Sequence, residues 1–168
     1  FYDATEGEVF VNDINVKEYD LNALREDIVT MVLQKAELFS GTIKDNIGWG
    51  KKDASMEEII EASKIAQAHD FISGFENGYD TIVAEKGASL SGGQKQRISI
   101  ARALIRKPEI LIFDDSTSAL DLKTEANLYK DLNEKMSDTT VIIIAQRVAS
   151  VRNADKILII NDGIIEAF

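Results

Sequence analysis

Apolar residues are distributed along the chain in two patterns that belong to different secondary structures. Short uninterrupted runs, rich in β-branched side chains, are typical of buried strands. Longer stretches carry apolar side chains at helical spacing, as at Ile59, Ala62 and Ile65, which indicates one buried helix face. The predicted strands are 28–33, 110–113 and 140–145, and the predicted helices are 55–66, 92–106 and 122–135. Because strand and helix alternate, we predict an α/β fold built on a parallel sheet.

Capping and turn residues support these boundaries. Ser55, followed by Glu57 and Glu58, makes a good helix start, because a hydroxyl side chain and acidic residues stabilise the free N–H groups there. Turn residues at 12–13 and 161–163 predict a turn near the beginning of the chain and a hairpin near its end.

The composition narrows the class of protein. The 168 residues are 45% hydrophobic and 29% charged, which suits one globular domain with a real core. The net charge of -10 argues against a broad nucleic-acid-binding face, so we expect no nucleic acid partner. With no cysteine and one histidine, thiolate and histidine-rich metal sites are excluded. No apolar run approaches the ~20 residues that cross a bilayer, so we expect any link to a membrane through another domain or chain.

A Ser/Gly-rich segment directly before the predicted helix 92–106 is a candidate anion site. It reads Leu90-Ser-Gly-Gly-Gln94. Two glycines let the backbone approach a ligand closely, and the helix start offers free N–H groups and the positive end of the helix dipole. Ser91 adds a hydroxyl donor. The segment therefore suits a terminal phosphate, and an ordinary Ser/Gly helix cap is the alternative.

Polar side chains follow two of the predicted strands. Asp114 and Asp115 end the second strand, where side chains of a parallel sheet point into the ligand crevice. Asp114 suits Mg²⁺, held directly or through water, and Asp115 lies where a water-activating base would be. A short polar turn at 118–121 comes next, and Gln34 follows the first strand. An acidic strand end that faces solvent is the alternative interpretation.

In this order and at this spacing, the segments resemble the ATP-binding cassette (ABC) family. Residues 90–94 match its signature motif without a change. Residues 110–115 resemble its Walker B strand, residues 118–121 its D-loop, and Gln34 its Q-loop glutamine. The resemblance implies a P-loop NTPase-like parallel sheet with a helical signature subdomain, and an ATPase that uses ATP and Mg²⁺.

Further segments resemble exporters in which a transmembrane domain is fused to the ATP-binding domain. They are 38–47, 68–72 and 78–87. In such exporters the stretch after the Q-loop glutamine faces the coupling helices of the transmembrane domain. The resemblance therefore implies two partners, those coupling helices and a second nucleotide-binding domain, at the cytoplasmic face of the cell membrane. Residues 81–87 resemble the exporter X-loop, with Ile82 where an acidic residue is usual.

The resemblance assigns a role to each residue that matches a family motif. These domains dimerise head to tail, so the signature loop is expected to serve the opposite site. The implied catalytic residues are Gln34, Asp115 and Gln146. The implied Mg²⁺ ligands are Asp114 and Gln34. The implied nucleotide-binding residues are Asp121 and, acting in trans, Ser91, Gly92, Gly93 and Gln94.

The sequence contains no P-loop of the form Gly-x-x-x-x-Gly-Lys-Ser/Thr. The residues around Gly50 lack both its first glycine and its hydroxyl residue. In the family, the P-loop helix lies just upstream of a segment like 1–7. We therefore expect an incomplete fold without the P-loop strand and helix, with apolar surface exposed and no ATPase activity in this chain alone. Within 1–168, a partial nucleotide-binding domain, residues 42–95 are expected to form the helical signature subdomain and the remainder a RecA-like core.

Two implied catalytic positions depart from the family pattern. Asp115 stands where a glutamate normally acts on the attacking water, and its carboxylate is withdrawn by roughly 1.5 Å. A misplacement of ~1 Å can cost about 10²-fold in rate. Gln146 stands where a histidine normally contacts the γ-phosphate, and an amide can hydrogen-bond phosphate but cannot carry a proton. Beside an intact signature loop, these changes predict the degenerate half of a heterodimeric exporter.

Two other functions remain open from the sequence. A soluble cassette ATPase that acts on DNA or ribosomes would share the signature and Walker B segments. Its usual coiled-coil insertion or basic patches do not appear in the sequence. A non-catalytic regulatory half is the second alternative, and the residues at positions 115 and 146 give it some support.

Five further residues are expected to be structural. His69 lies at a helix end and matches the exporter pattern there. For Phe39 and Trp49 we expect packing in the core or between domains, in preference to stacking on adenine. Lys95 and Arg97 are expected to form a solvated helix face.

Overall fold

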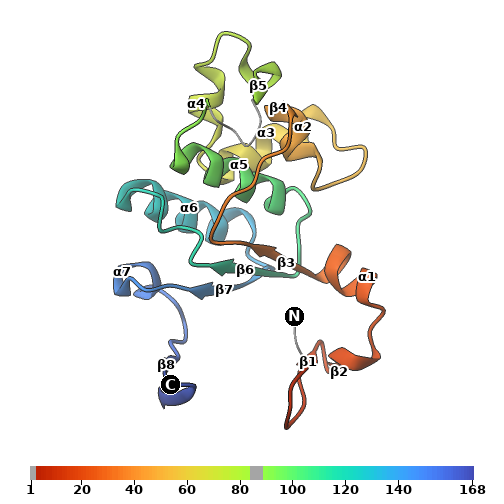
Figure 1. Ribbon diagram of the computed structural model, residues 1–168, viewed down its shortest axis with the longest axis vertical. Coiled ribbons are helices and arrows are strands. Elements are labelled where there is room, and N and C mark those ends of the chain that lie inside the picture. Colours follow the sequence, from red (N-terminus) through yellow and green to blue (C-terminus); the bar gives the residue numbers. More distant parts are fainter. Residues whose placement is uncertain (1–2, 84–88) are drawn as a thin grey trace.

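A three-stranded parallel sheet lies at the centre of the computed structural model, which describes residues 3–83 and 89–168 (Figure 1). The strand order is β3-β6-β7, with β3 at Val29–Val32, β6 at Ile110–Asp114 and β7 at Thr140–Ile144. Both strand pairs are parallel. The predicted α/β fold with a parallel sheet is therefore confirmed.

The strands of this sheet are not equally buried. In β6, Phe113 is 1% exposed. In β7, Ile143 packs against the core, whereas Ile142 and Ile144 are 45% and 50% exposed. The prediction of a buried strand at 140–145 is therefore wrong for one face of β7. The sequence did not reveal the exposed face, because successive side chains of a strand point to opposite faces and isoleucine occupies both faces of β7.

Helices α3 (Met56–Ile65), α5 (Gly92–Leu104) and α6 (Leu122–Lys135) match the predicted helices closely. The start of α3 shows why. The Ser55 hydroxyl accepts a hydrogen bond from the Glu58 N–H at 3.2 Å, and the Glu58 carboxylate accepts one from the Ser55 N–H at 2.9 Å. This reciprocal pair is a capping box, which satisfies two backbone donors that the helix leaves free.

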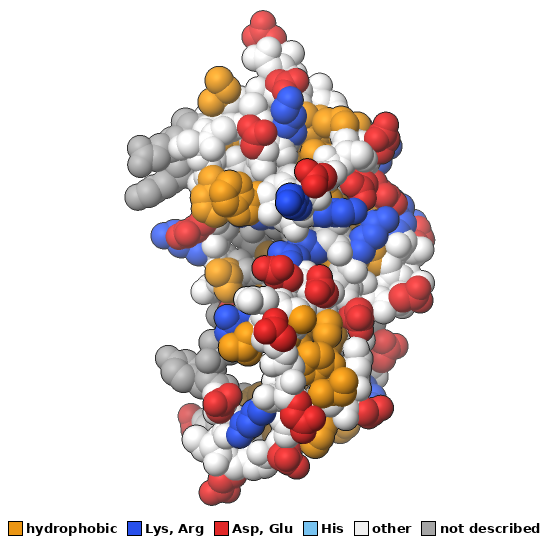
Figure 2. All heavy atoms as spheres, turned by 90° about the vertical axis from the view of Figure 1, so that its right-hand side faces the viewer, with side chains coloured by type: hydrophobic (Ala, Val, Ile, Leu, Met, Phe, Trp, Pro, Cys, Tyr) orange, Lys and Arg blue, Asp and Glu red, His pale blue; other side chains and the backbone are white. Residues whose placement is uncertain are grey.

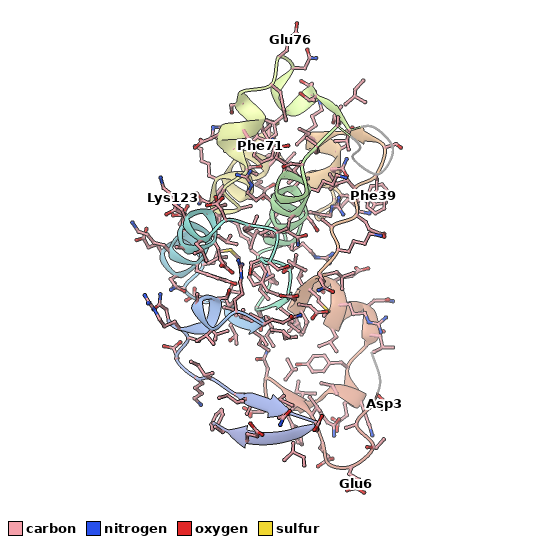
Figure 3. All side chains as sticks on the ribbon, turned by 60° about the vertical axis from the view of Figure 1, so that its left-hand side comes forward. Asp3, Glu6, Phe39, Phe71, Glu76 and Lys123 are labelled. Atoms are coloured by element: carbon pink, nitrogen blue, oxygen red, sulfur yellow. The ribbon has the colours of Figure 1, made fainter. Side chains whose placement is uncertain are left out.

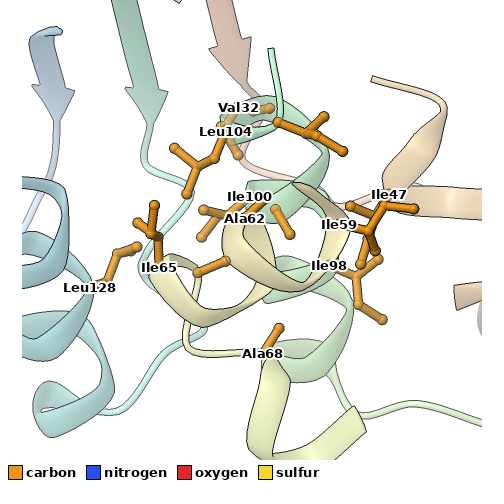
Figure 4. Packing of buried hydrophobic residues seen from close by; sticks show 14 of the residues in the cluster. Val32, Ile47, Ile59, Ala62, Ile65, Ala68, Ile98, Ile100, Leu104 and Leu128 are labelled. Carbon is orange, nitrogen blue, oxygen red and sulfur yellow. The ribbon is translucent and has the colours of Figure 1, made fainter. Parts of the chain in front are cut away.

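The core lies where these three helices meet beside the sheet (Figure 4). Ile98, Ile100 and Leu104 of α5 are each at most 2% exposed. They pack with Ile65 of α3 and Leu128 of α6 in one cluster. Burying a side chain of this size stabilises the fold by about 1.5–3 kcal/mol. The helix that begins at the signature segment is therefore held firmly along its length.

A second group of elements sits above α5 in Figure 1. It contains α3 and four shorter elements: β4 (Gly41–Thr42), α2 (Ile43–Gly48), α4 (His69–Ser73) and β5 (Ile82–Val83). Strands β4 and β5 pair antiparallel. Arg102 of α5 joins this group to the segment after Gln34, because its guanidinium donates to the Asn46 carbonyl at 2.7 Å and to the Glu37 carbonyl at 3.0 Å.

Two short hairpins lie at the opposite end of the molecule. They are β1 (Phe10–Val11) with β2 (Ile14–Asn15), and β8 (Ile159–Asn161) with β9 (Ile164–Ala167). Asn12 and Asp13 have φ of 49° and 61°, as a two-residue hairpin turn requires. Both predicted turns are therefore confirmed.

The remaining helical segments are short. They are the 3₁₀ turns Val16–Glu18 and Gly78–Asp80, α1 (Leu21–Ala23), the π-helical turn Leu24–Ile28, and α7 (Val148–Val151). Among the described residues, none of the helices combines the length and the apolar character needed to cross a membrane.

Candidate functional site

The carboxyl ends of the three parallel strands bring together three residues that are far apart in the sequence. Gln34 lies two residues after β3, Asp115 directly after β6, and Gln146 two residues after β7. The Gln34 amide Nε2 donates to Asp115 Oδ2 at 2.9 Å, and the Gln146 Nε2 donates to the same oxygen at 3.2 Å. The structure thus gathers all three candidate catalytic residues into one cluster.

The backbone of Asp115 is bent sharply to aim this carboxylate. Its φ of 46° lies in the left-handed region, which is uncommon for a residue other than glycine. The Asp115 N–H donates to the Ile144 carbonyl at 2.8 Å, and the Asp115 carbonyl accepts from the Ser118 hydroxyl at 2.8 Å. These two bonds offset a backbone cost of about 1–3 kcal/mol. They fix the turn between β6 and the segment 118–121.

Oxygen atoms at this edge of the sheet suit a hard divalent cation. Asp114 ends β6 directly before Asp115. Because Gln34 uses Nε2 to bond Asp115, its Oε1 is the amide atom that can serve another ligand. Mg²⁺ prefers oxygen ligands and is usually held by one or two carboxylates together with substrate phosphates. The donor set of Asp114 and Gln34 fits such an ion.

The candidate anion segment forms the start of α5. The Ser91 hydroxyl accepts from the Gln94 N–H at 3.3 Å, and Gln94 Oε1 accepts from the Ser91 N–H at 2.9 Å. Ser91 is therefore a helix cap. Neither its hydroxyl proton nor the Gln94 Nε2 is donated to another of the described residues, so both suit a ligand. A Cβ added at Gly92 would meet no atom within 4 Å, so the backbone there is open to close approach.

The signature segment also touches the D-loop candidate of the same chain. A Cβ added at Gly93 would lie 3.1 Å from the Ala119 carbonyl oxygen, which is tighter than an ordinary contact. Asp121, at the end of that turn, caps α6 by accepting from the Thr124 N–H at 3.0 Å. The Thr124 hydroxyl also donates to its carboxylate at 2.6 Å and holds the pKa of Asp121 below its usual value. The structure therefore gives Asp121 a capping contact, and among the described residues no hydrogen bond joins residues 91–94 to Gln34, Asp115 or Gln146.

Two residues of α5 have contacts that the sequence interpretation did not anticipate. Arg97 does not lie on a solvated face, so that expectation is wrong. Its guanidinium lies 4.5 Å from the centre of the Phe71 ring and donates to the Gln67 carbonyl at 2.7 Å. Gln96 is 2% exposed and donates to the carbonyl of Leu33 at 3.3 Å. The sequence does contain a sign of this role, because Gln96 is a polar residue at a position where the same face of the helix is otherwise apolar.

A groove of about 320 Å³ lies beside the segment that follows Gln34. Its lining includes Leu33, Phe39, Trp49, Arg102 and Arg106. Figure 3 shows Phe39 and Phe71 on either side of α5. On the face that carries α1 and α2, Figure 2 shows a band of basic side chains with hydrophobic side chains above and below it.

The aromatic residues of this groove are not part of the core. Phe39 and Trp49 are 46% and 72% exposed, with ring centres 5.2 Å apart. Core packing, one of the two expected environments, is therefore wrong for both. His69 has a structural contact, a hydrogen bond of 2.9 Å between its Nδ1 and the Tyr79 hydroxyl. The X-loop candidate falls largely outside the described residues, because 84–88 are not described.

Tyr129 of α6 packs behind the turn that carries Asp115. Its ring meets Phe113 edge-on at 6.0 Å, and its hydroxyl lies 3.3 Å from the Thr117 hydroxyl. Burial raises the pKa of Tyr129 from 10.0 to about 12. As the pH rises, the Tyr129 phenol therefore loses its proton at a lower pH in the unfolded chain than in the folded one.

This shift predicts a component of alkaline instability that belongs to Tyr129. Its contribution is complete below pH 10 and is lost as the pH approaches 12, because the folded state keeps the proton longer than the unfolded state. In urea unfolding at pH 8 and pH 11, we expect the unmodified protein to lose about 1 kcal/mol more than Tyr129→Phe. Equal losses in the two proteins would contradict this assignment.

Comparisons with known proteins agree with the geometry. The family profile described as ABC transporter matches residues 1–118. ABC transporter B family member 1 of Dictyostelium discoideum is 49% identical over 99% of this chain, which spans 18% of that protein. The leptomycin B resistance protein pmd1 of Schizosaccharomyces pombe is 48% identical over 98% of the chain, which spans 12% of that protein. The ABC transporter ATP-binding protein YknU of Bacillus subtilis is 48% identical over 97% of the chain and 28% of its own length.

A solved structure shows the same fold. A bacterial Atm1-family ABC exporter with ATP bound superposes with a TM-score of 0.93 at 38% identity, over 99% of this chain and 29% of that one. The resemblance to the ATP-binding domains of exporters, argued from the segments after Gln34 and at 90–121, is therefore confirmed. Since the family match extends over 118 of the 168 residues, the chain belongs to the ABC transporter family.

Proposed function

We propose that this chain is part of the nucleotide-binding domain of an ABC exporter and that ATP binding and hydrolysis there power transport across a membrane. The observation that carries the proposal is the convergence of Gln34 and Gln146 on one carboxylate oxygen of Asp115. It occurs at the carboxyl edge of a parallel sheet, where such folds bind ligands. Residues 42–95 would supply the helical signature subdomain and the remainder of 1–168 the RecA-like core.

Each residue of the cluster has a chemical task in this proposal. Asp114 and Gln34 Oε1 would hold Mg²⁺, and the ion would supply positive charge that neutralises the phosphates. Asp115 orients the attacking water and accepts its proton, while the Gln146 amide donates to the γ-phosphate. The Asp115 carboxylate is one methylene short of a glutamate, and Gln146 cannot take up a proton. Both features favour binding over rapid hydrolysis at this site.

The signature segment supports a different role, at the site of a second domain. Within the part of the chain that the structure describes, the Ser91 hydroxyl proton and the Gln94 Nε2 have no acceptor, and they lie beside the open backbone of Gly92. The N-terminus of α5 adds a positive dipole end. Residues 91–94, with Asp121 nearby in the D-loop, would therefore close over ATP bound by a partner. The segment that would serve the partner's site is intact, whereas the site around Asp115 is weakened. This combination favours the degenerate half of a heterodimer.

The groove beside Gln34 favours an exporter over a soluble ATPase. Its exposed pair, Phe39 and Trp49, lies next to Arg102, whose guanidinium is 4.9 Å from the Phe39 ring centre. Apolar and cationic groups together suit a helix from another domain, here a coupling helix at the cytoplasmic face of the cell membrane. The names of the relatives, among them a drug-resistance protein and an exporter, support the same proposal. A non-catalytic regulator remains the second candidate, because of Asp115 and Gln146.

ATP turnover by the complete subunit, alone and co-expressed with a candidate partner half, tests the proposal. We expect slow turnover alone and a rise of about 10-fold or more with the partner, because the partner's site then gains an intact signature loop. Full activity of the subunit alone would contradict the heterodimer. If both samples bound ATP but neither hydrolysed it, the result would favour the non-catalytic regulator.

A further inference from the structure

We propose that Glu125 is a positioning residue that holds the Gln146 amide in place for the γ-phosphate of ATP. The inference rests on the proposed function, and it adds a residue outside the motifs discussed above. Glu125 lies on α6, four residues after the helix cap Asp121. It is a buried carboxylate, 3% exposed, on the helix side of the sheet.

Both carboxylate oxygens of Glu125 are occupied by hydrogen bonds from outside its own helix. Oε1 accepts from the Thr117 hydroxyl at 2.6 Å and from the Ser150 hydroxyl at 2.7 Å. Oε2 accepts from Arg147 Nη2 at 3.0 Å. A buried charge is tolerated when it is paired and fully hydrogen-bonded in this way, and truncating one partner is costly.

These bonds close a ring that passes through the candidate catalytic cluster. Arg147 follows Gln146 directly, and its Nη2 also donates to the Thr117 carbonyl at 3.0 Å. Thr117 lies two residues after Asp115, whose Oδ2 accepts from Gln146. The ring therefore runs from Asp115 along the chain to Thr117, across Glu125 to Arg147, and back through Gln146.

The segment that carries Gln146 lies largely at the surface, where Gln146, Val148 and Ala149 are exposed. It leaves β7 at Ile144, and the α7 turn that follows has four residues with no side-chain cap at Arg147. Glu125 holds this segment at two points, Arg147 and Ser150. Because the contribution of a phosphate contact depends steeply on its placement, a change at Glu125 should act on ATP through Gln146.

The test uses Glu125→Gln in the complete subunit. The glutamine keeps the size of the side chain but removes the charge that pairs with Arg147. We expect the ratio of ATP to ADP affinity, measured by equilibrium nucleotide binding, to fall by about tenfold, because ADP lacks the γ-phosphate that Gln146 contacts. Glu134→Gln is the matched control: it lies on the same helix, 58% exposed at its side chain, with an ion pair of 3.9 Å to Lys130. It should leave the ratio unchanged.

A double-mutant cycle separates positioning from general support of the fold. Gln146→Ala should lower the ratio by itself, and adding Glu125→Gln should then lower it little further, since the group it positions is gone. Additive effects would overturn the proposal. Ser150→Ala, which removes one donor to Glu125 and spares the ion pair, should shift the ratio in the same direction by less. If Glu125→Gln does not fold, Ser150→Ala takes its place in the test.

Hydrogen–deuterium exchange gives a readout that does not depend on nucleotide. In Glu125→Gln, exchange should rise in the peptide 145–151 and stay unchanged in α5 and β6. Unchanged exchange at 145–151 would overturn the inference. If the unmodified subunit bound neither nucleotide, the proposed function would fail, whereas exchange at 145–151 would still decide whether Glu125 holds this segment in place.

Discussion

Replacing Gly92 by aspartate is expected to lower ATP turnover of the assembled heterodimer by about 100-fold or more, while leaving the fold intact. The Gly92 backbone faces open space, where an added Cβ meets nothing within 4 Å, so the side chain fits. Its carboxylate would lie at the N-terminus of α5, on the surface that we propose covers the phosphates of ATP in the partner. Removing the electrostatic stabilisation of a developing charge costs about 10²–10³-fold in rate.

The matched comparison is Asp115→Asn in the same chain, assayed with the same partner. In a heterodimer whose active site belongs to the partner, this change should alter turnover little, because Asp115 serves the slower site. Thermal unfolding of both variants provides the control for folding. A loss from Asp115→Asn as large as that from Gly92→Asp would show that both sites hydrolyse ATP and would contradict the degenerate half.

Gly50→Ala is expected to destabilise the domain by about 3 kcal/mol in free energy of unfolding. A Cβ at this position would lie 2.0 Å from the Arg102 carbonyl oxygen and 2.8 Å from Ile105 Cγ2. Both atoms belong to the buried end of α5 or directly follow it, so neither can move away cheaply. The segment after α2 would have to separate from α5, and with it the contacts of Arg102 around Asn46.

Gly48→Ala, two residues away, is the control. Its added Cβ would be 3.8 Å from Ile59 Cδ1, an ordinary van der Waals contact, and alanine favours the helix that glycine weakens. Urea unfolding of the two variants should therefore show a large loss at position 50 and none at position 48. Similar effects at both positions would mean that the close approach of Gly50 to α5 does not limit packing.

Much of the local structure could be predicted from the residues themselves. The boundaries of α6 and the start of α3 follow from side chains within one helical turn, such as the pairs Ser55 with Glu58 and Asp121 with Thr124. Sequence also indicated that Gln34 and Asp115 end parallel strands, which placed them at one edge of the sheet. Errors came where a pattern has two structural meanings, as for the isoleucines of β7, for Arg97, and for the exposed aromatic pair Phe39 and Trp49.

Sequence by itself therefore determined the fold class, the family resemblance and the identity of the candidate site residues, because these depend on short-range periodicity and on motifs of a few adjacent residues. Tertiary structure decided how the residues meet. Gln34 and Gln146, 81 and 31 positions away from Asp115, share one of its oxygens. The buried ring around Glu125 and the tight contact at Gly50 depend equally on packing between distant elements, which only the folded chain brings within hydrogen-bonding or van der Waals distance.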